Sequence, residues 1–276
     1  MTTTDVDAEA QDAALWREAV DSALAQDHAV LAHTRRDFGR SPGYPTTRRS
    51  RSVGGRPNLL EAVVLVGALA VGVVQRLELM RGPLGYIDLD EATAGIAARE
   101  FFTNPSVFFP SQPYGGTPET FLVGVVHALF GTGQVQLKII PILLHLGACG
   151  FVWGAARRVV PSRAGQLAAP ILLWLGPAAG VWESTKERGF YGAAIFVAAA
   201  IVWLVARIEH RPTRRDLIAF GLLAGAGWWI SPLLLLVVFP ATAWLLSREP
   251  TRLDDWKLVL PAAVLGALPW IGWNAV

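Results

Sequence analysis

Three acidic residues close together are the first candidates for chemistry in this chain. Asp88, Asp90 and Glu91 stand just before and at the start of a predicted helix over 91–102. A carboxylate that is partly shielded from water at a membrane surface can take a proton from an acceptor hydroxyl as a general base. The same residue types also stabilise a helix start, because Asp accepts hydrogen bonds from the free amides and Glu favours the positive end. From the residues alone, both interpretations of the Asp90–Glu91 pair stay open.

A metal ion is a further candidate partner of these acids. Asp88, Asp90 and Glu91 offer the hard oxygen ligands that divalent cations prefer, although their spacing is not diagnostic of a metal site. The single cysteine, Cys149, excludes an intrachain disulfide and a cysteine-based metal site. No cofactor is therefore predicted with certainty, and a divalent cation is the one candidate.

A second charged group lies in the segment ESTKERGF at 183–190. Lys186 and Arg188 can hold a phosphate, and the planar guanidinium of Arg can do so through two parallel hydrogen bonds. The alternative is a solvated turn in which Glu183 and Glu187 neutralise the two bases. The segment alone does not decide between these interpretations.

The elements that would position these side chains are those of a membrane protein. Hydrophobic residues make up 53% of the 276 residues and charged residues 17%, and the apolar residues come in long runs rather than on one face. This composition excludes a disordered chain and speaks against a soluble enzyme. The 11 Trp and 27 Gly suit membrane helices, where Trp settles at the interface and Gly allows close packing. Nucleic-acid binding is not supported, because the arginines cluster by membrane side rather than along one helix.

Residues 1–58 are predicted to form a cytoplasmic tail. Seven arginines lie between 35 and 56, in a stretch rich in Pro, Gly, Ser and Thr that buries too little apolar surface to fold on its own. A weak amphipathic helix is predicted upstream, within 9–32. The first span follows over 59–80, with Glu61 and Arg76 reaching towards the interfaces at its ends. Arginines just before a first span place the N-terminus in the cytoplasm.

The remaining spans follow from run length and charge. The run at 119–131 has 13 residues, which is ~20 Å as a helix against a hydrocarbon core of ~30 Å, so it is predicted to lie in the interface. The Arg-rich loops 157–163 and 207–216 then both face the cytoplasm. One long tilted helix over 217–246 is the alternative to two short spans there. With the first span, about seven result, the later ones lying near 137–156, 165–182, 190–206, 217–230, 233–246 and 258–276.

The prediction is thus an all-α polytopic membrane protein in which residues 59–276 form the transmembrane domain. Its first extracytoplasmic loop, 81–136, is predicted to contain two short interfacial helices. Four prolines and the Gly115–Gly116 pair between these helices argue against a regular element there.

Short motifs stand in a fixed order between the apolar runs: Asp90-Glu91-Ala92 with Gly95; Tyr114-Gly115-Gly116 with Glu119; Phe130-Gly131; Lys186-x-Arg188-Gly189-x-Tyr191; Gly225-x-Gly227-Trp228-Trp229-x-Ser231-Pro232; and Pro269-Trp270-x-x-Trp273-Asn274. This order resembles the GT-C superfamily of integral-membrane glycosyltransferases. It is most similar to the bacterial branch related to dolichyl-phosphate-mannose protein mannosyltransferases and lipid A aminoarabinose transferases. The resemblance covers roughly residues 59–276 and not the tail.

The resemblance implies a GT-C-like helix bundle that moves a sugar from a polyprenyl-phosphate donor to a hydroxyl group. The acceptor would be a glycan, lipid or protein on the extracytoplasmic face of the plasma membrane. The general base falls on Asp90, with Glu91 as a supporting acid. Substrate-binding roles fall on a further set of side chains, namely Asp88, Tyr114, Glu119, Lys186, Arg188 and Tyr191.

Proteins of this kind usually continue with several more spans, so the chain is expected to be the N-terminal portion of a longer member. The alternative function is a non-catalytic polytopic membrane protein, either a transporter or a degenerate partner subunit. A transporter would show internal repeats and broken helices near the middle of the membrane. The charges here lie in the predicted outer loops instead, which favours the enzyme.

Overall fold

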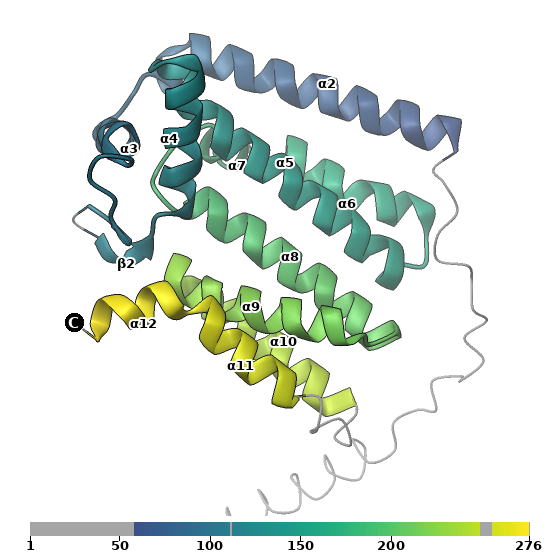
Figure 1. Cartoon of the computed structure of the whole chain (residues 1–276). Coiled ribbons are helices and arrows are strands. Elements are labelled where there is room, and N and C mark those ends of the chain that lie inside the picture. Colours follow the sequence, from purple (N-terminus) through teal and green to yellow (C-terminus); the bar gives the residue numbers. More distant parts are fainter. Residues whose placement is uncertain (1–57, 111, 249–255, 276) are drawn as a thin grey trace, which may run out of the picture. The chain divides into compact units, whose positions relative to one another are not determined.

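The computed structural model describes residues 58–110, 112–248 and 256–275, and these residues form an all-α membrane-protein fold (Figure 1). The predicted tail and its amphipathic helix lie outside the described residues, apart from Asn58. Asn58 caps the first helix, because its side chain accepts a hydrogen bond from the Glu61 amide at 2.8 Å. The helices are α2 (Leu59–Arg81), α3 (Leu89–Glu100), α4 (Pro118–Phe130), α5 (Gln134–Val159), α6 (Arg163–Leu175), α7 (Ala178–Glu183), α8 (Tyr191–His210), α9 (Arg214–Ile230), α10 (Leu235–Arg248), α11 (Trp256–Gly266) and α12 (Leu268–Asn274).

Three of the described helices, α2, α5 and α8, are long and apolar enough to cross a membrane. A fourth span results if α11 and α12, which meet at a bend of 56°, are counted as one. The seven spans expected from the sequence are therefore not all present as full-length helices. The run at 165–182 is cut at Gly176–Pro177 into α6, with 13 residues, and the short α7. At ~1.5 Å per residue, α6 reaches only about two thirds of the way across the hydrocarbon core.

The region 217–246 forms two helices and not one. Helix α9 ends at Ile230, and the 3-10 turn η2 (Pro232–Leu234) leads into α10. Helix α10 turns back to pack against α8, as α9 does. Pro232 lacks the amide hydrogen that a continuing helix needs, which explains the break. The alternative of one long helix is wrong.

The ends of several helices meet on one side and carry most of the arginines. Arg207, near the end of α8, pairs with Asp216 at the start of α9 at 2.9 Å. Arg163, at the start of α6, pairs with Glu61 at the start of α2 at 2.7 Å. The loops 157–163 and 207–216 therefore lie at the same end of the bundle. That this end faces the cytoplasm stays a prediction.

The opposite end carries the segment 81–136, in which the two expected short helices are α3 and α4. Figure 1 shows α4 crossing the ends of α5 and α8 instead of running alongside them. The linker between α3 and α4 was expected to be irregular, but it contains an antiparallel pair of strands, β1 (Phe108–Phe109) and β2 (Gln112–Gly116). A two-stranded hairpin consists of edge strands only, and edge strands tolerate proline. The Trp229 indole donates to the Val107 carbonyl at 2.9 Å and so holds this hairpin on α9.

Arg76 does not reach an interface as expected but is buried between α2 and the α6–α7 region. Its guanidinium stacks on the Trp174 ring at 3.6 Å and donates to the Ser184 hydroxyl at 3.0 Å. Gly72 makes the close approach possible, since a Cβ atom there would lie 1.9 Å from the Trp174 indole nitrogen. Arg76 thereby connects the first span to the segment 184–190, which carries Lys186 and Arg188.

Candidate functional site

The start of α3 is fixed by a reciprocal pair of hydrogen bonds. The Asp88 carboxylate accepts from the Glu91 amide at 3.0 Å, and the Glu91 carboxylate accepts from the Asp88 amide at 3.4 Å. This capping box makes Asp88 the cap residue. The helix begins at Leu89, two residues before the predicted start, so Asp90 lies inside its first turn.

Glu91 is fully buried and bound on both carboxylate oxygens. Lys138 of α5 contacts one oxygen and Lys186 contacts the other, the latter at 2.7 Å. The Lys138 ammonium also donates to the Thr185 carbonyl at 3.3 Å. Removal of one partner from a buried ion pair typically costs about 3–5 kcal/mol, because the remaining charge is left without compensation. Glu91, predicted to be a supporting acid in catalysis, therefore connects α3, α5 and the segment 184–190 in this structure.

Lys186 and Arg188 have different environments, although they are only two residues apart. The Lys186 side chain is 2% exposed, and its ammonium contacts Glu91, the Tyr86 carbonyl at 2.9 Å and Asp88 at 3.3 Å. The solvated-turn alternative is therefore wrong for Lys186. The Arg188 side chain is 25% exposed and makes two long ion pairs, with Asp88 at 3.5 Å and Glu183 at 3.4 Å. Its buried Nε–H has no hydrogen-bond partner in the described part of the chain, so Arg188 has a donor to spare.

Of the three acids, Asp90 is the one most open to solvent. Its side chain is exposed and forms no hydrogen bond or ion pair with any described residue. Successive residues of an α-helix are separated by ~100°, so Asp90 stands at the edge of the face that buries Glu91 and Ala94. Asp88 is more constrained: partial burial raises the pKa of its carboxyl, but the Glu91 amide and the nearby Lys186 and Arg188 charges lower it below the usual value.

A second pair of carboxyl groups lies deeper, where α4 meets the segment 184–190. Glu119 and Glu187 are fully buried and lie close enough to influence each other's proton binding, and each keeps one carboxyl oxygen without a hydrogen-bond partner among the described residues. The other contacts are amides: Ala193 donates to Glu119 at 2.8 Å, and Gly189 donates to Glu187 at 3.0 Å. Burial raises the pKa of Glu119 to about 7, and burial together with the Glu119 charge raises the pKa of Glu187 well above its usual value. Two carboxyl groups in contact favour one shared proton, because both charges cannot be stabilised together.

Around Glu91, Lys138 and Lys186 supply two positive charges against the one negative charge of Glu91. One ionised carboxyl of the nearby Glu119–Glu187 pair would supply a second negative charge. Glu119 was predicted to contact substrate, but in this conformation it has no access to solvent.

The two predicted tyrosines meet at one aromatic residue. The exposed ring of Tyr114 lies edge-on to Phe190, with 5.9 Å between the ring centroids. The exposed ring of Tyr191 stacks on Phe190, with 4.7 Å between the ring centroids. Phe190 itself is buried. The tyrosines therefore present an aromatic surface beside the segment that carries Lys186 and Arg188.

The structure thus brings together Asp88, Glu91, Lys186 and Arg188, with Asp90 at the edge of the group. Lys138 was missed from the sequence as part of a site, although it carried a signal, since a charge inside an apolar run is costly and commonly has a partner. Glu187 was named only as an acid that could neutralise the two bases, and its closeness to Glu119 could not be predicted because the two are far apart in the sequence. Within the described ranges, no three His, Cys, Asp or Glu side chains lie close enough to hold a metal ion.

Comparison with known families decides the assignment. The family model described as dolichyl-phosphate-mannose-protein mannosyltransferase matches residues 119–273, which is more than half of the chain. The chain belongs to this family. It is therefore a member of a family of GT-C membrane glycosyltransferases, as the order of its motifs indicated. No curated protein and no solved structure matches the chain.

The matched range includes much of the site but not its first part. It begins in the first turn of α4, at Glu119, and contains Lys138, Glu187 and Arg188. The start of α3, with Asp88, Asp90 and Glu91, precedes the match. The roles of these three acids therefore rest on the geometry described above.

Proposed function

We propose that this protein transfers a sugar from a polyprenyl-phosphate donor to a hydroxyl group on a glycan, lipid or protein. Family membership supports sugar transfer within a membrane, and the name of the family points to a lipid-phosphate donor. The reaction takes place on the extracytoplasmic face of the plasma membrane. The arginines at the opposite helix ends support this orientation, because positively charged loops remain in the cytoplasm.

The observation that carries the proposal is an exposed carboxylate, Asp90, on the same helix start whose cap residue, Asp88, pairs with Arg188. Glu91 fixes the start of α3 through two buried lysines, and this leaves Asp90 at the surface. Asp88 bridges the same helix start to Arg188. A glycosyl transfer to a hydroxyl needs a base for the hydroxyl proton and a positive charge for the leaving phosphate.

The proposed reaction assigns a separate task to each of these groups. Asp90 takes the proton of the acceptor hydroxyl, whose oxygen forms a bond to the anomeric carbon of the sugar. The bond between that carbon and the phosphate oxygen breaks, and polyprenyl phosphate leaves. Arg188 stabilises the charge that develops on the phosphate, because its side chain is 25% exposed and its ion pairs with Asp88 and Glu183 are long.

Lys186 and the tyrosines have supporting roles in this proposal. Lys186 contributes positive charge near the phosphate but mainly holds Glu91 and the Tyr86 carbonyl in position. Tyr114 and Tyr191 provide an exposed aromatic surface against which the apolar face of a sugar can lie. Glu119 supports the segment 184–190 by positioning Glu187.

The test is sugar transfer by the full chain in vesicles, with labelled polyprenyl-phosphate sugars as donors. Asp90→Asn should lower the transfer rate by about 10²- to 10⁴-fold with little change in the KM for the donor, because it removes a base and keeps the shape. Glu100→Gln, at the exposed end of the same helix, is the matched control and should leave the rate unchanged. A near wild-type rate for Asp90→Asn would show that the base lies elsewhere. Absence of transfer from every polyprenyl-phosphate sugar by the wild type would overturn the donor class.

A further inference from the structure

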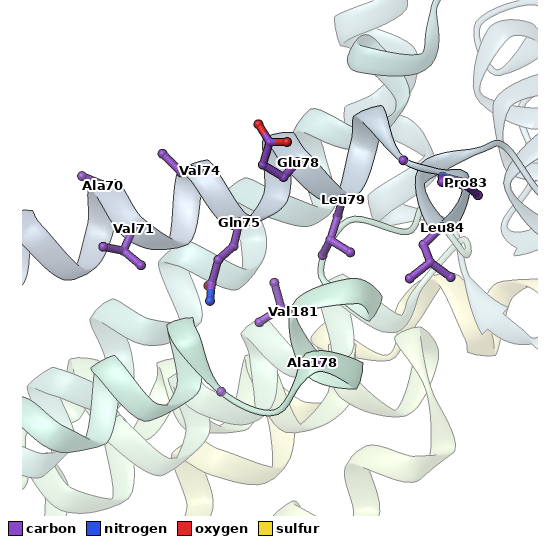
Figure 2. Close-up of a pocket in the computed structure, with 12 residues that line it drawn as sticks. Ala70, Val71, Val74, Gln75, Glu78, Leu79, Pro83, Leu84, Ala178 and Val181 are labelled. Carbon is purple, nitrogen blue, oxygen red and sulfur yellow. The ribbon is translucent and has the colours of Figure 1, made fainter.

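An apolar groove runs along α2 and is open on the side of the described bundle where α2 faces α7. Its volume is about 810 Å³, within the range of small-molecule sites, and it lies between α2, the turn η1 (Pro83–Gly85) and the α6–α7 connection. Figure 2 shows Gln75 and Leu79 extending from α2 towards α7, from which Val181 extends back, and Val71 one turn earlier on the same side of α2. The other lining residues are Ala70, Val74, Glu78, Gly82, Pro83, Leu84, Gly176 and Ala178.

One end of the groove adjoins the charged site. Leu84 and Val181 form the wall at this end. The next residue after Val181, Trp182, donates from its indole to the Leu84 carbonyl at 2.9 Å. The Trp182 ring also lies near cations, with the Arg188 guanidinium carbon at 5.1 Å and the Lys186 ammonium at 5.5 Å from its centre. Trp182 therefore contacts both the wall of the groove and the two basic side chains.

Hydrogen bonds around η1 fix the same boundary between the groove and the charged site. Two residues beyond Leu84, the Tyr86 carbonyl accepts from Lys186 at 2.9 Å. The Gln134 amide holds the Gly85 carbonyl at 2.8 Å and the Met80 carbonyl at 3.2 Å. The groove wall and the site are thus parts of one continuous, hydrogen-bonded segment, so the distance between them is set by the fold.

We infer that this groove holds the isoprenoid chain of the lipid phosphate while its phosphate lies at Arg188. The inference rests on the proposed function and adds to it the place of the lipid chain. A ligand that fits both parts must be apolar along its length and anionic at one end, as a polyprenyl phosphate is. The groove opens along a helix that is otherwise exposed to the membrane, so the chain can enter sideways from the bilayer.

The groove should contribute more to the position of the lipid phosphate than to the affinity for the lipid. In a bilayer, a lipid chain gains little from leaving other lipid chains, since both surroundings are apolar. A chain laid along α2 instead restricts where its phosphate can lie, which favours a reactive geometry. The length of the chain should therefore matter for binding in the groove and not for contacts at Arg188.

The decisive experiment is photo-crosslinking of the full chain in vesicles with a long-chain polyprenyl phosphate that carries a photoreactive group on its isoprenoid chain. This probe contains no sugar, so the result does not depend on catalysis. The inference predicts adducts between Ala70 and Leu84, on α2 and η1, and on α7. Adducts confined to other helices, or adducts that an equal amount of phosphatidylglycerol removes, would overturn it.

Filling the groove provides the matched comparison. Val71→Trp places a large ring in the groove, whereas Val73→Trp changes the same residue type on a part of α2 that does not line it. Val71→Trp should remove the adducts on α2 and α7, because a ring that fills the groove excludes the isoprenoid chain from it. Binding of geranyl phosphate, whose chain is too short to extend far along α2, should change little in either variant. Equal losses for Val71→Trp and Val73→Trp would contradict the assignment. If the wild type binds the probe in the groove yet transfers no sugar, the proposed reaction fails and the lipid site stands.

Discussion

At the residue scale, Asp90 and Glu91 show how two adjacent acids acquire opposite roles. The helix turns Glu91 towards Lys138 and Lys186 and leaves Asp90 at the surface. The Asp-Glu pair could be recognised in the sequence, and its two possible roles could be stated. Which acid takes which role could not be predicted, because this depends on Lys138 and Lys186, which lie 47 and 95 residues beyond Glu91.

Arg188 and Lys186 can be separated by one experiment at this scale. Arg188→Gln should lower kcat/KM for the donor about 10- to 100-fold, because hydrogen bonds to a charged phosphate are worth about 1.5–3 kcal/mol. Lys186→Met should instead lower thermal stability, since it leaves the buried Glu91 with one partner fewer. The measurements are donor kinetics and the midpoint of thermal unfolding for both variants. Arg99→Gln, an exposed change on α3, serves as the control. Unchanged donor kinetics in a folded Arg188→Gln protein would contradict the phosphate contact.

At the scale of elements, most helices were predictable and their connections were not. Long apolar runs predicted α2, α5 and α8, and Ser231–Pro232 marked the break between α9 and α10. The break at Gly176–Pro177 was not predicted, because 165–182 was expected to be one span. The hairpin β1–β2 could not be predicted from its prolines and glycines. It is stabilised by Trp229, which lies more than 100 residues later and donates to Val107.

The Glu119–Glu187 pair connects α4 to the segment before α8 and should make their packing depend on pH. A carboxyl whose pKa is raised by folding binds its proton more tightly in the folded state, so stability falls as the pH rises from the unfolded value near 4.5 to the folded value of about 7. The midpoint of thermal unfolding in detergent should accordingly fall between pH 5 and pH 8. Glu119→Gln removes this titration and keeps an amide that can donate to Glu187, so it should flatten the profile.

Glu100→Gln is the control for this prediction, because Glu100 is an exposed acid of the same type. Its profile should follow that of the wild type. The shared-proton interpretation would be wrong if Glu119→Gln kept the wild-type slope of stability against pH.

At the scale of the whole molecule, family membership and geometry cover different parts of the chain. The family match begins at Glu119 and establishes a membrane glycosyltransferase, but it does not reach α3. The geometry connects α3 to the matched part through Glu91, which contacts Lys138 of α5 and Lys186 before α8. A base on α3 and a phosphate contact at Arg188 therefore belong to one site only if α3 lies on the same side of the membrane as the segment 184–190, as the structure places it.

The last prediction concerns which end of the bundle faces the cytoplasm. The Arg-rich loops at one end of the bundle should be cytoplasmic, so single cysteines at positions 160 and 212 should resist a membrane-impermeant thiol reagent in intact cells. A Cys149→Ser background removes the buried native thiol. Thr132→Cys, in the exposed turn between α4 and α5 on the opposite side, should be labelled without permeabilisation. After permeabilisation, positions 160 and 212 should be labelled too, which controls for accessibility. Labelling of 160 or 212 in intact cells would invert the bundle, and it would move Asp90 and Arg188 to the cytoplasmic face.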